Sequence, residues 1–296
     1  MTTIAFIGLG HMGNPMAANL VKAGHKVLGF DLLPDNLSVA AGNGVTIATS
    51  AETAVAEADV VITMLPAGKH VLSVYEAVVK SAKNNALFID SSTIDVDSAR
   101  KAHAIALGNG LLSVDAPVSG GIGGAAAGTL TFMVGGSADA FTKAETVLKH
   151  MGARIVHCGE AGNGQAAKIC NNMILGISMI GVSEAFTLAE KLGLSHQALF
   201  DVASTSSGQC WSLTTYCPVP GPVATSPANN GYKPGFAAAL MLKDLRLSQE
   251  AAKSVGAATP LGAHAEALYA EFGAAGNDGS DFSGIINYLR ETKRQN

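Results

Sequence analysis

The stretch "TIAFIGLGHMGNPMAANL", residues 3–20, decides the fold. It begins as a short apolar run, passes through Gly8, Gly10 and Gly13 in the G-x-G-x-x-G spacing, and continues with helical periodicity. The next apolar run, "HKVLGFD", ends in Asp31. A glycine turn between a strand and a helix, followed by an acid after the second strand, can hold a pyrophosphate on helix amides and a ribose on the carboxylate. The spacing alone is weak, but this context favours dinucleotide binding over a purely structural turn, with the loop residues Gly8, Gly10, His11, Met12 and Gly13 at the cofactor.

Asp31 also indicates which dinucleotide is bound. Its carboxylate would repel a 2′-phosphate, and the residues that follow, Leu32, Leu33 and Pro34, include no arginine to accept one. The sequence therefore predicts NAD in preference to NADP.

Alternating apolar runs and helical stretches continue to about residue 160. Continuous apolar strands separated by helices are typical of a parallel sheet covered on both faces. The predicted strands lie in the runs "TIAFIGLG", "HKVLGFD", "ADVVITMLP", "ALFIDSST", "LLSVDAPVSG", "LTFMVGG" and "ARIVHCG". We expect an α/β fold, a Rossmann-type doubly wound domain over residues 1–162.

Residues 163–296 show no convincing strand and predict an all-helical domain. A long helix over 164–192 is expected to join the two domains. Further helices are predicted after the N-cap Ser195, from Phe236 to Gly256, and from the cap Thr259 to Gly273. The Pro- and Gly-rich segment 217–235 is predicted to be a loop.

Composition excludes several classes of function. With 48% hydrophobic residues, 14% charged residues and a net charge of −4, the chain has no basic field for nucleic acid or an acidic membrane surface. The stretch 169–183 is short and polar for a membrane span, and no basic leader precedes the first strand, so a cytoplasmic protein is expected. The four cysteines and eight histidines lack metal-site spacing, and no metal is predicted. The basic end, 290–296, is interpreted as a solvated tail.

A glycine loop after a predicted strand is the first candidate substrate site. Ser119, Gly120 and Gly121 can offer successive amides and a hydroxyl to an anion. The seven glycines from 120 to 136 would equally make a flexible loop, and the loop by itself does not decide between the two.

Lys168 is the second candidate, because it lies near the start of the long predicted helix and is followed by fifteen uncharged residues, Ile169 through Ser183. Helical spacing places Lys168 and Asn172 on one face. Burial favours the neutral form of a lysine, which can then accept a proton from a hydroxyl or return one to a carbonyl. The alternative is a lysine whose long stem carries its charge out to solvent. The apolar helix also predicts a homo-oligomer, a dimer or tetramer.

Four motifs, "FIGLGHMGNPMAANL", "DAPVSGG", "GNGQAAKICNN" and "GFAAALMLKDL", together resemble the 3-hydroxyacid dehydrogenase family over about residues 3–290. The loop "CPVPGPVATSPANNGYKPGF" is similar to that of the members that oxidise 3-hydroxyisobutyrate in valine breakdown. The resemblance implies an NAD-dependent enzyme in which a small 3-hydroxy acid lies between the domains against the long helix.

Site roles follow from the same resemblance. It implies that Lys168 is the general acid/base and that Ser119, Gly120, Gly121 and Asn172 bind the substrate. It also implies that Leu65, Pro66 and Thr93 line the cofactor, with Phe236 and Lys243 approaching it from one helix face of the helical domain. Trp211, the only tryptophan, is predicted either to wall the substrate pocket or to pack between domains. His70 stands where many relatives have asparagine, and its role stays open.

Other functions remain possible on the sequence alone. The same residues would serve an enzyme for L-serine, tartronate semialdehyde or succinic semialdehyde. A non-enzymatic NAD sensor is disfavoured because Lys168 and Asn172 are both present. A 6-phosphogluconate enzyme is disfavoured because the C-terminal half is short for that family.

Overall fold

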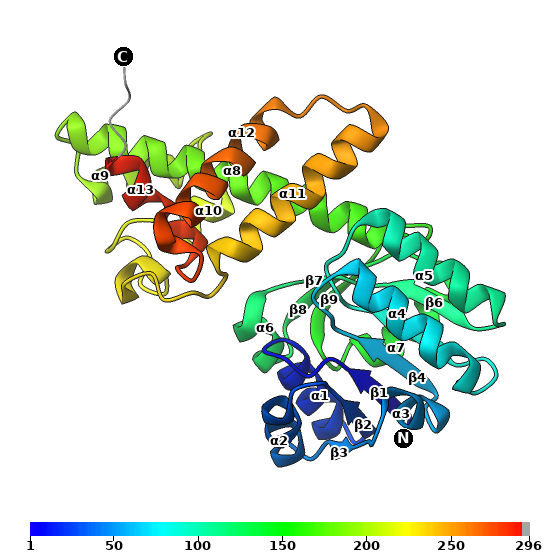
Figure 1. The fold of residues 1–296 in the computed structure, drawn as a ribbon. Coiled ribbons are helices and arrows are strands. Elements are labelled where there is room, and N and C mark those ends of the chain that lie inside the picture. Colours follow the sequence, from blue (N-terminus) through cyan, green and yellow to red (C-terminus); the bar gives the residue numbers. More distant parts are fainter. Residues whose placement is uncertain (292–296) are drawn as a thin grey trace. The chain divides into compact units, whose positions relative to one another are not determined.

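The computed structural model describes residues 1–291, and the chain forms two compact units, Met1–Lys168 and the residues from Ile169 on (Figure 1). The expected domain boundary falls between residues 162 and 163, whereas the units divide within helix α8 (Asn163–Lys191). The predicted solvated tail lies almost wholly outside the described residues, since only Arg290 and Glu291 of it are described, at the end of helix α13.

The N-terminal unit is built on a six-stranded parallel sheet in the order β3-β2-β1-β4-β5-β6. This confirms the predicted Rossmann-type arrangement. One strand, β3, was not predicted, because its two residues carry no readable alternation. The strands are β1 (Thr3–Ile7), β2 (Lys26–Phe30), β3 (Thr46–Ile47), β4 (Val60–Thr63), β5 (Leu87–Asp90) and β6 (Leu112–Asp115).

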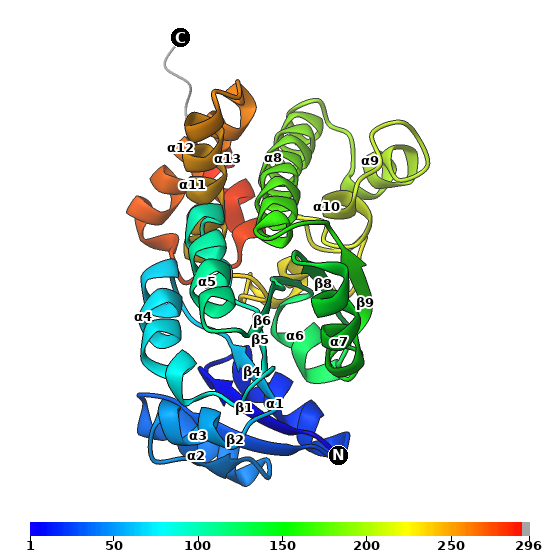
Figure 2. The ribbon, with the colours of Figure 1, turned by 90° about the vertical axis from the view of Figure 1, so that its right-hand side faces the viewer.

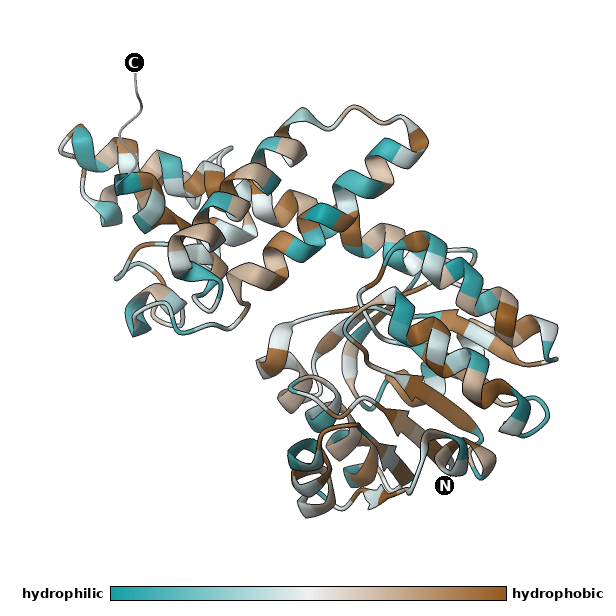
Figure 3. Ribbon diagram, viewed as in Figure 1, coloured by the Kyte–Doolittle hydropathy of each residue, from teal (hydrophilic) through white to brown (hydrophobic). Residues whose placement is uncertain are grey.

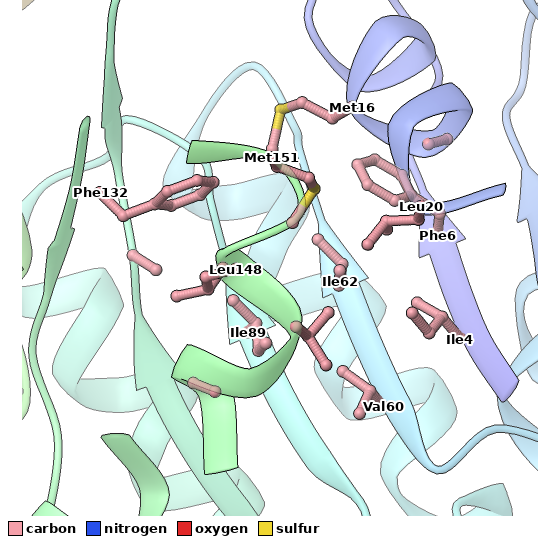
Figure 4. Close-up of a cluster of buried hydrophobic side chains, with 14 of the residues drawn as sticks. Ile4, Phe6, Met16, Leu20, Val60, Ile62, Ile89, Phe132, Leu148 and Met151 are labelled. Atoms are coloured by element: carbon pink, nitrogen blue, oxygen red, sulfur yellow. The ribbon is translucent and has the colours of Figure 1, made fainter. Parts of the chain in front are cut away.

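Helices cover both faces of this sheet (Figures 1 and 2). Alternate residues of β1 show why: Ile4 and Phe6 pack toward α1 and α7, while Ala5 and Ile7 pack toward α3, α4 and α5. Hydropathy colouring shows the strands as predominantly apolar (Figure 3), and a close-up shows the first of these two cores, where Phe6 lies near Met16 and Leu20 (Figure 4). The helices are α1 (Gly13–Lys22), α2 (Pro34–Gly42), α3 (Ala51–Ala56), α4 (Gly68–Val78), α5 (Val96–Gly108), α6 (Gly121–Ala127) and α7 (Ala138–Leu148).

A separate sheet contains two of the predicted strands, β8 (Leu130–Val134) and β9 (Gly152–His157), together with β7 (Val118–Ser119), which was predicted as one strand with β6 in the run "LLSVDAPVSG". The expectation of one parallel series is wrong here, because β7 and β8 are antiparallel, with Ser119 opposite Thr131. The connection over 120–129 is shorter than the dozen or so residues that a parallel crossover needs. A bridge between Asp115 and Gly135 links the second sheet to the end of β6.

The C-terminal unit is helical, and its described residues contain no strand beyond an isolated bridge between Ala237 and Asp281. Helix α11 begins at Ala238 and not at Phe236, because the backbone there is held extended: Phe282 N donates to Phe236 O at 2.9 Å. Thr259 precedes α12 but does not cap it, since its hydroxyl donates to Gln249 at 2.9 Å. The helices are α8 (Asn163–Lys191), α9 (His196–Ala203), α10 (Trp211–Thr214), α11 (Ala238–Val255), α12 (Pro260–Phe272) and α13 (Ile285–Glu291).

Helix α8 is long and apolar enough to cross a membrane, judged by length and composition alone. The sequence argument against a span considered only residues 169–183, whereas the helix extends over 29 residues. Core helices of soluble proteins pass the same test, so the observation is weak evidence for a membrane.

Candidate active site

The glycine turn after β1 is shaped by two close backbone approaches. Gly8 has φ +95°, and a Cβ there would lie 2.3 Å from the Met64 carbonyl oxygen. A Cβ on Gly13 would lie 1.9 Å from the Gly8 carbonyl oxygen. Both positions therefore require glycine for the fold itself.

Gly10 differs from its two neighbours. A Cβ on Gly10 would meet no protein atom within 4 Å, and its φ is not in the left-handed region. Neither packing nor backbone conformation explains a glycine at this position. The remaining reason is the close approach of a ligand, which is the role of the second glycine in a dinucleotide fingerprint. The turn thus fits a pyrophosphate.

Asp31 lies directly against this turn. One of its carboxylate oxygens accepts from Leu9 N at 2.7 Å and the other from Leu33 N at 2.8 Å. The neighbouring Asn14, 7% exposed, donates to Leu9 O at 3.1 Å and to Asn36 O at 3.2 Å. Asn14 was not singled out in the sequence, although it follows the last glycine of the motif. These bonds fix the glycine turn relative to the end of β2. Of the other two turn residues, His11 is exposed and Met12 partly buried.

The chain reverses its direction across the sheet between β1 and β4, and ligands of open α/β sheets bind at such a switch point. Leu65 and Pro66 follow β4 at this edge. Leu65 N donates to Ser92 Oγ at 2.8 Å, and Ser92 Oγ donates to Asp90 at 2.6 Å. The next residue, Thr93, is partly exposed. The structure thus brings Leu65, Pro66 and the segment of Thr93 to the same edge as the glycine turn.

Asp90, at the end of β5, is a buried carboxyl that the sequence did not single out. One oxygen accepts from Thr63 and Ser92, while the other, Oδ2, has no hydrogen-bond partner among the described residues. Burial and, to a smaller extent, the nearby Asp115 raise the pKa of Asp90 to about 6, in opposition to these hydrogen bonds. The preceding run "LFI" predicts a buried strand, but no local pattern predicts that the acid at its end is buried as well.

The candidate substrate loop begins at the end of β7. Ser119 is partly buried, Gly120 has φ +133° and Gly121 has φ +61°. Two consecutive positive-φ residues are open only to glycine at low cost. The loop is therefore a defined turn that leads into α6.

Lys168 and Asn172 lie one turn apart on α8. Lys168 is 6% exposed and Asn172 is 1% exposed, so this lysine does not extend into solvent. Asn172 Nδ2 donates to the carboxylate of Asp244 on α11, and its Oδ1 accepts from Asn171 at 3.0 Å. Asp244 holds the orientation of the amide, a partner that the sequence gave only as part of the "KD" motif.

The remaining candidates belong to the helical unit. Trp211 begins α10 and is 49% exposed, with its ring stacked on Tyr216 at a centroid distance of 4.9 Å. Phe236 packs edge-to-face on Phe282 at 5.7 Å, outside α11. Lys243 is partly buried within α11. Because Phe236 precedes the first residue of that helix, the expected helix face shared by Phe236 and Lys243 does not exist.

Comparison with known proteins supports a dehydrogenase. Residues 3–159 match the model of the NAD binding domain of 6-phosphogluconate dehydrogenase. Residues 162–289 match the model described as NAD-binding of NADP-dependent 3-hydroxyisobutyrate dehydrogenase. A probable 3-hydroxyisobutyrate dehydrogenase of Mycobacterium tuberculosis is 58% identical over 290 residues, covering 98% of each chain. The chain belongs to the 3-hydroxyisobutyrate dehydrogenase family.

Other members of the 3-hydroxyisobutyrate dehydrogenase family are nearly as similar. The enzyme of Pseudomonas aeruginosa is 49% identical, covering 98% of this chain and 99% of the relative. The structure of the M. tuberculosis 3-hydroxyisobutyrate dehydrogenase with L-serine superposes with a TM-score of 0.95 at 58% identity, covering 98% of this chain and 99% of that one. The chain is accordingly an NAD(P)-dependent oxidoreductase acting on a small hydroxy acid.

Among residues 1–291 no group of three or more His, Cys, Asp or Glu side chains could hold a metal ion. His70 is exposed in the first turn of α4.

Proposed function

We propose that this protein oxidises 3-hydroxyisobutyrate to methylmalonate semialdehyde with NAD, as a step of valine catabolism, and that Lys168 is its general acid/base. The observation that carries the proposal is the burial of Lys168, 6% exposed, one helical turn from the buried amide of Asn172. A chain 58% identical to a probable 3-hydroxyisobutyrate dehydrogenase supports the choice of substrate.

The chemistry assigned to the chain is proton transfer and orientation. The nicotinamide, when bound, accepts the hydride lost from the hydroxyl-bearing carbon. Lys168 Nζ takes the hydroxyl proton during oxidation and returns it to the carbonyl in the reverse direction. The Ser119 hydroxyl and the amides of Gly120 and Gly121 hold the substrate carboxylate. Asn172 orients the reacting oxygen, with Trp211 against the rest of the substrate.

The cofactor is proposed to be NAD and not NADP. Both carboxylate oxygens of Asp31 are held by backbone amides, so its negative charge is fixed where a 2′-phosphate would lie. The adjacent Leu32 and Leu33 are exposed and offer no cation. The residues proposed to contact the cofactor are Gly8, Gly10, His11, Met12, Gly13, Asp31, Leu65, Pro66, Thr93, Phe236 and Lys243.

L-Serine is the second candidate substrate. The solved structure of the M. tuberculosis relative is one with L-serine, which shares a carboxylate and a hydroxyl on the third carbon with 3-hydroxyisobutyrate. The two acids differ in a methyl and an ammonium group on the second carbon. An apolar contact there would favour the methyl group.

The deciding experiment is initial NADH formation with 3-hydroxyisobutyrate, L-serine, D-glycerate and 4-hydroxybutyrate, each with NAD and with NADP. We expect the highest kcat/KM for 3-hydroxyisobutyrate with NAD. A higher value for another acid would move the substrate assignment and leave the mechanism. No turnover with any acid, from folded protein that binds NAD, would favour the sensor.

The role of Lys168 needs a variant and a matched control. Lys168→Ala is expected to lower kcat by about 10²–10⁴-fold, the usual contribution of a general acid/base. Lys191→Ala, at the exposed end of the same helix, should leave kcat unchanged. Near-normal turnover by Lys168→Ala would show that another group is the base.

A homo-oligomer is proposed from the surface of α8. Apolar or small residues recur along one side of it, at helical spacing: Cys170, Ile174, Ile177, Gly181, Ala185 and Leu188. Ile174 and Leu188 are 63% and 60% exposed. A second copy of the chain would cover this stripe. Light scattering should give the mass of a dimer or tetramer, and Ile174→Glu should shift the oligomer toward monomer.

A cytoplasmic location stays a prediction.

A further inference from the structure

The first turn of α8 is tied to the nucleotide-binding unit by two buried side chains that the proposed mechanism does not use. Asp115, at the end of β6, is 1% exposed, and Gln165, inside α8, is 0% exposed. Both belong to the same compact unit as Lys168. Together they form a clasp, a name used below for these two side chains and their hydrogen bonds.

Asp115 holds the N-terminus of α8. Its Oδ1 accepts from Gly162 N at 2.7 Å, and its Oδ2 accepts from Gln165 N at 2.8 Å. Amides at a helix start have no partner within the helix, and a negative charge is favoured there. His103 Nε2 lies 3.1 Å from Oδ1 and fixes the carboxylate from the side of α5.

The start of α8 packs against the strands without space for a larger side chain. A Cβ on Gly164 would lie 2.3 Å from the Met133 carbonyl oxygen and 2.7 Å from Asp115 Oδ2. A Cβ on Gly135 would lie 2.5 Å from Asp115 Oδ1. The helix start is therefore packed directly on the backbone of β8 and on the carboxylate, and a small change at Asp115 must move it.

Gln165 ties the same turn to the segment that carries Thr93. Its Nε2 donates to Ser92 O at 2.7 Å, and its Oε1 accepts from Ile94 N at 3.1 Å. The amide thus bonds to the backbone on both sides of Thr93, a residue proposed to line the cofactor. Both ends of the side chain are used, so its rotamer is fixed.

The clasp connects the segments that the reaction must align. Lys168 follows Gln165 by three residues, a rise of about 4.5 Å along the helix. Ser119 follows Asp115 by four residues along the chain. Asp115 thus precedes the substrate loop in the chain. Gln165 precedes Lys168 and is hydrogen-bonded to the backbone on both sides of Thr93. We propose that Asp115 and Gln165 are positioning residues that set the place of Lys168 relative to the cofactor and the substrate. This inference rests on the proposed role of Lys168.

Three variants of similar size test the clasp. Asp115→Asn replaces one acceptor by an amide nitrogen, which leaves an N–H of the α8 turn without an acceptor. Gln165→Glu places an oxygen against Ser92 O, and Gln165→Met is the second variant at this position, because it removes both bonds without adding a charge. Each should lower kcat by about 10²-fold, the scale expected for a displacement of about 1 Å. The Kd for NAD should change far less than kcat, since the glycine turn and Asp31 are untouched.

Asp95→Asn is the matched control. Asp95 Oδ1 accepts from Ser98 N at 2.7 Å and caps α5, so the variant removes the negative charge of a carboxylate cap on another helix. It should retain kcat. Equal losses of kcat in Asp95→Asn and Asp115→Asn would overturn the proposal, because any lost helix cap would then have the same effect.

A double variant separates positioning from general stability. In the Lys168→Ala background, Gln165→Met should cause no further loss in the single-turnover rate, because there is no lysine left to position. Additive losses, or an unchanged kcat in the Gln165 and Asp115 single variants, would refute the clasp. Retained turnover in Lys168→Ala alone would instead refute the proposed base.

Discussion

The second glycine of the nucleotide loop offers the sharpest test of the cofactor site, because the structure separates it from its neighbours. An alanine methyl at Gly10 meets no protein atom within 4 Å, whereas at Gly13 it would lie 1.9 Å from the Gly8 carbonyl oxygen. Gly10→Ala should therefore leave the folded protein undisturbed, and could stabilise it by about 0.4–1 kcal/mol through the unfolded chain. Gly13→Ala should destabilise it by about 1–3 kcal/mol or more.

Binding should respond differently. A methyl at Gly10 would hold the pyrophosphate away from the helix amides and weaken bonds to charged groups of about 1.5–3 kcal/mol each. The Kd for NAD should rise at least about tenfold. At NAD concentrations that stabilise the native protein by about 2.7 kcal/mol, the variant should gain about 1.4 kcal/mol less.

Thermal unfolding with and without NAD, together with calorimetric titration, measures both effects. Without NAD, Gly10→Ala should melt at or above the temperature of the native protein, and Gly13→Ala several degrees below it. An unchanged Kd in Gly10→Ala would refute the assignment of Gly10 to the pyrophosphate. A melting temperature lowered as far as that of Gly13→Ala would refute the distinction between them.

Three further predictions concern buried or aromatic side chains. Because burial raises the pKa of Asp90 to about 6 from 3.8, the folded state holds this proton more tightly than the unfolded chain, and stability falls as pH rises through that window. Asp90→Asn should remove a loss of roughly 3 kcal/mol, so the variant should melt above the native protein at pH 7.5 but not at pH 4. Asp281→Ala should destabilise the helical unit by at least about 3 kcal/mol in urea unfolding, because it leaves several donors without their acceptor. Asp281 is fully buried and accepts from Tyr216, Gly235, Phe236 and Ser283. As the control, Asp201→Ala at an exposed position should change the free energy of unfolding little. Trp211→Ala should raise KM for 3-hydroxyisobutyrate at least tenfold in steady-state kinetics without changing the Kd for NAD, and an unchanged KM would remove Trp211 from the substrate site.

The sequence predicted the parallel sheet because its strands are continuous apolar runs between helices, a signal that local periodicity carries. It missed the antiparallel pairing of β7 with β8, because strand direction depends on the length of the connection and not on apolarity. It also placed the start of α11 two residues too early. The apolar residues from Phe236 on suit a helix, but Asp281, which bonds to the amides of Gly235 and Phe236, is far away in the chain.

In the candidate site, too, the sequence singled out the residues with nearby partners and missed those with distant ones. Motif spacing singled out Gly8, Gly10 and Asp31, whose hydrogen-bond partners lie within residues 3–33. Asp115 and Gln165 have partners 47 to 73 residues away, which no local pattern connects. Asp115 lies in the motif "DAPVSGG", but its position within an apolar run indicates no more than a residue of a strand.

Dividing this enzyme into its parts has to respect the bonds of Asp115. A fragment cut after residue 162, where composition changes, would keep Gly162 N but lose the Gln165 amide, and would leave one oxygen of a carboxylate that is 1% exposed without its donor. It would also remove the Gln165 side chain from Ser92 and Ile94. The nucleotide-binding half therefore extends at least through the first turn of α8, and a separately expressed version should include that turn.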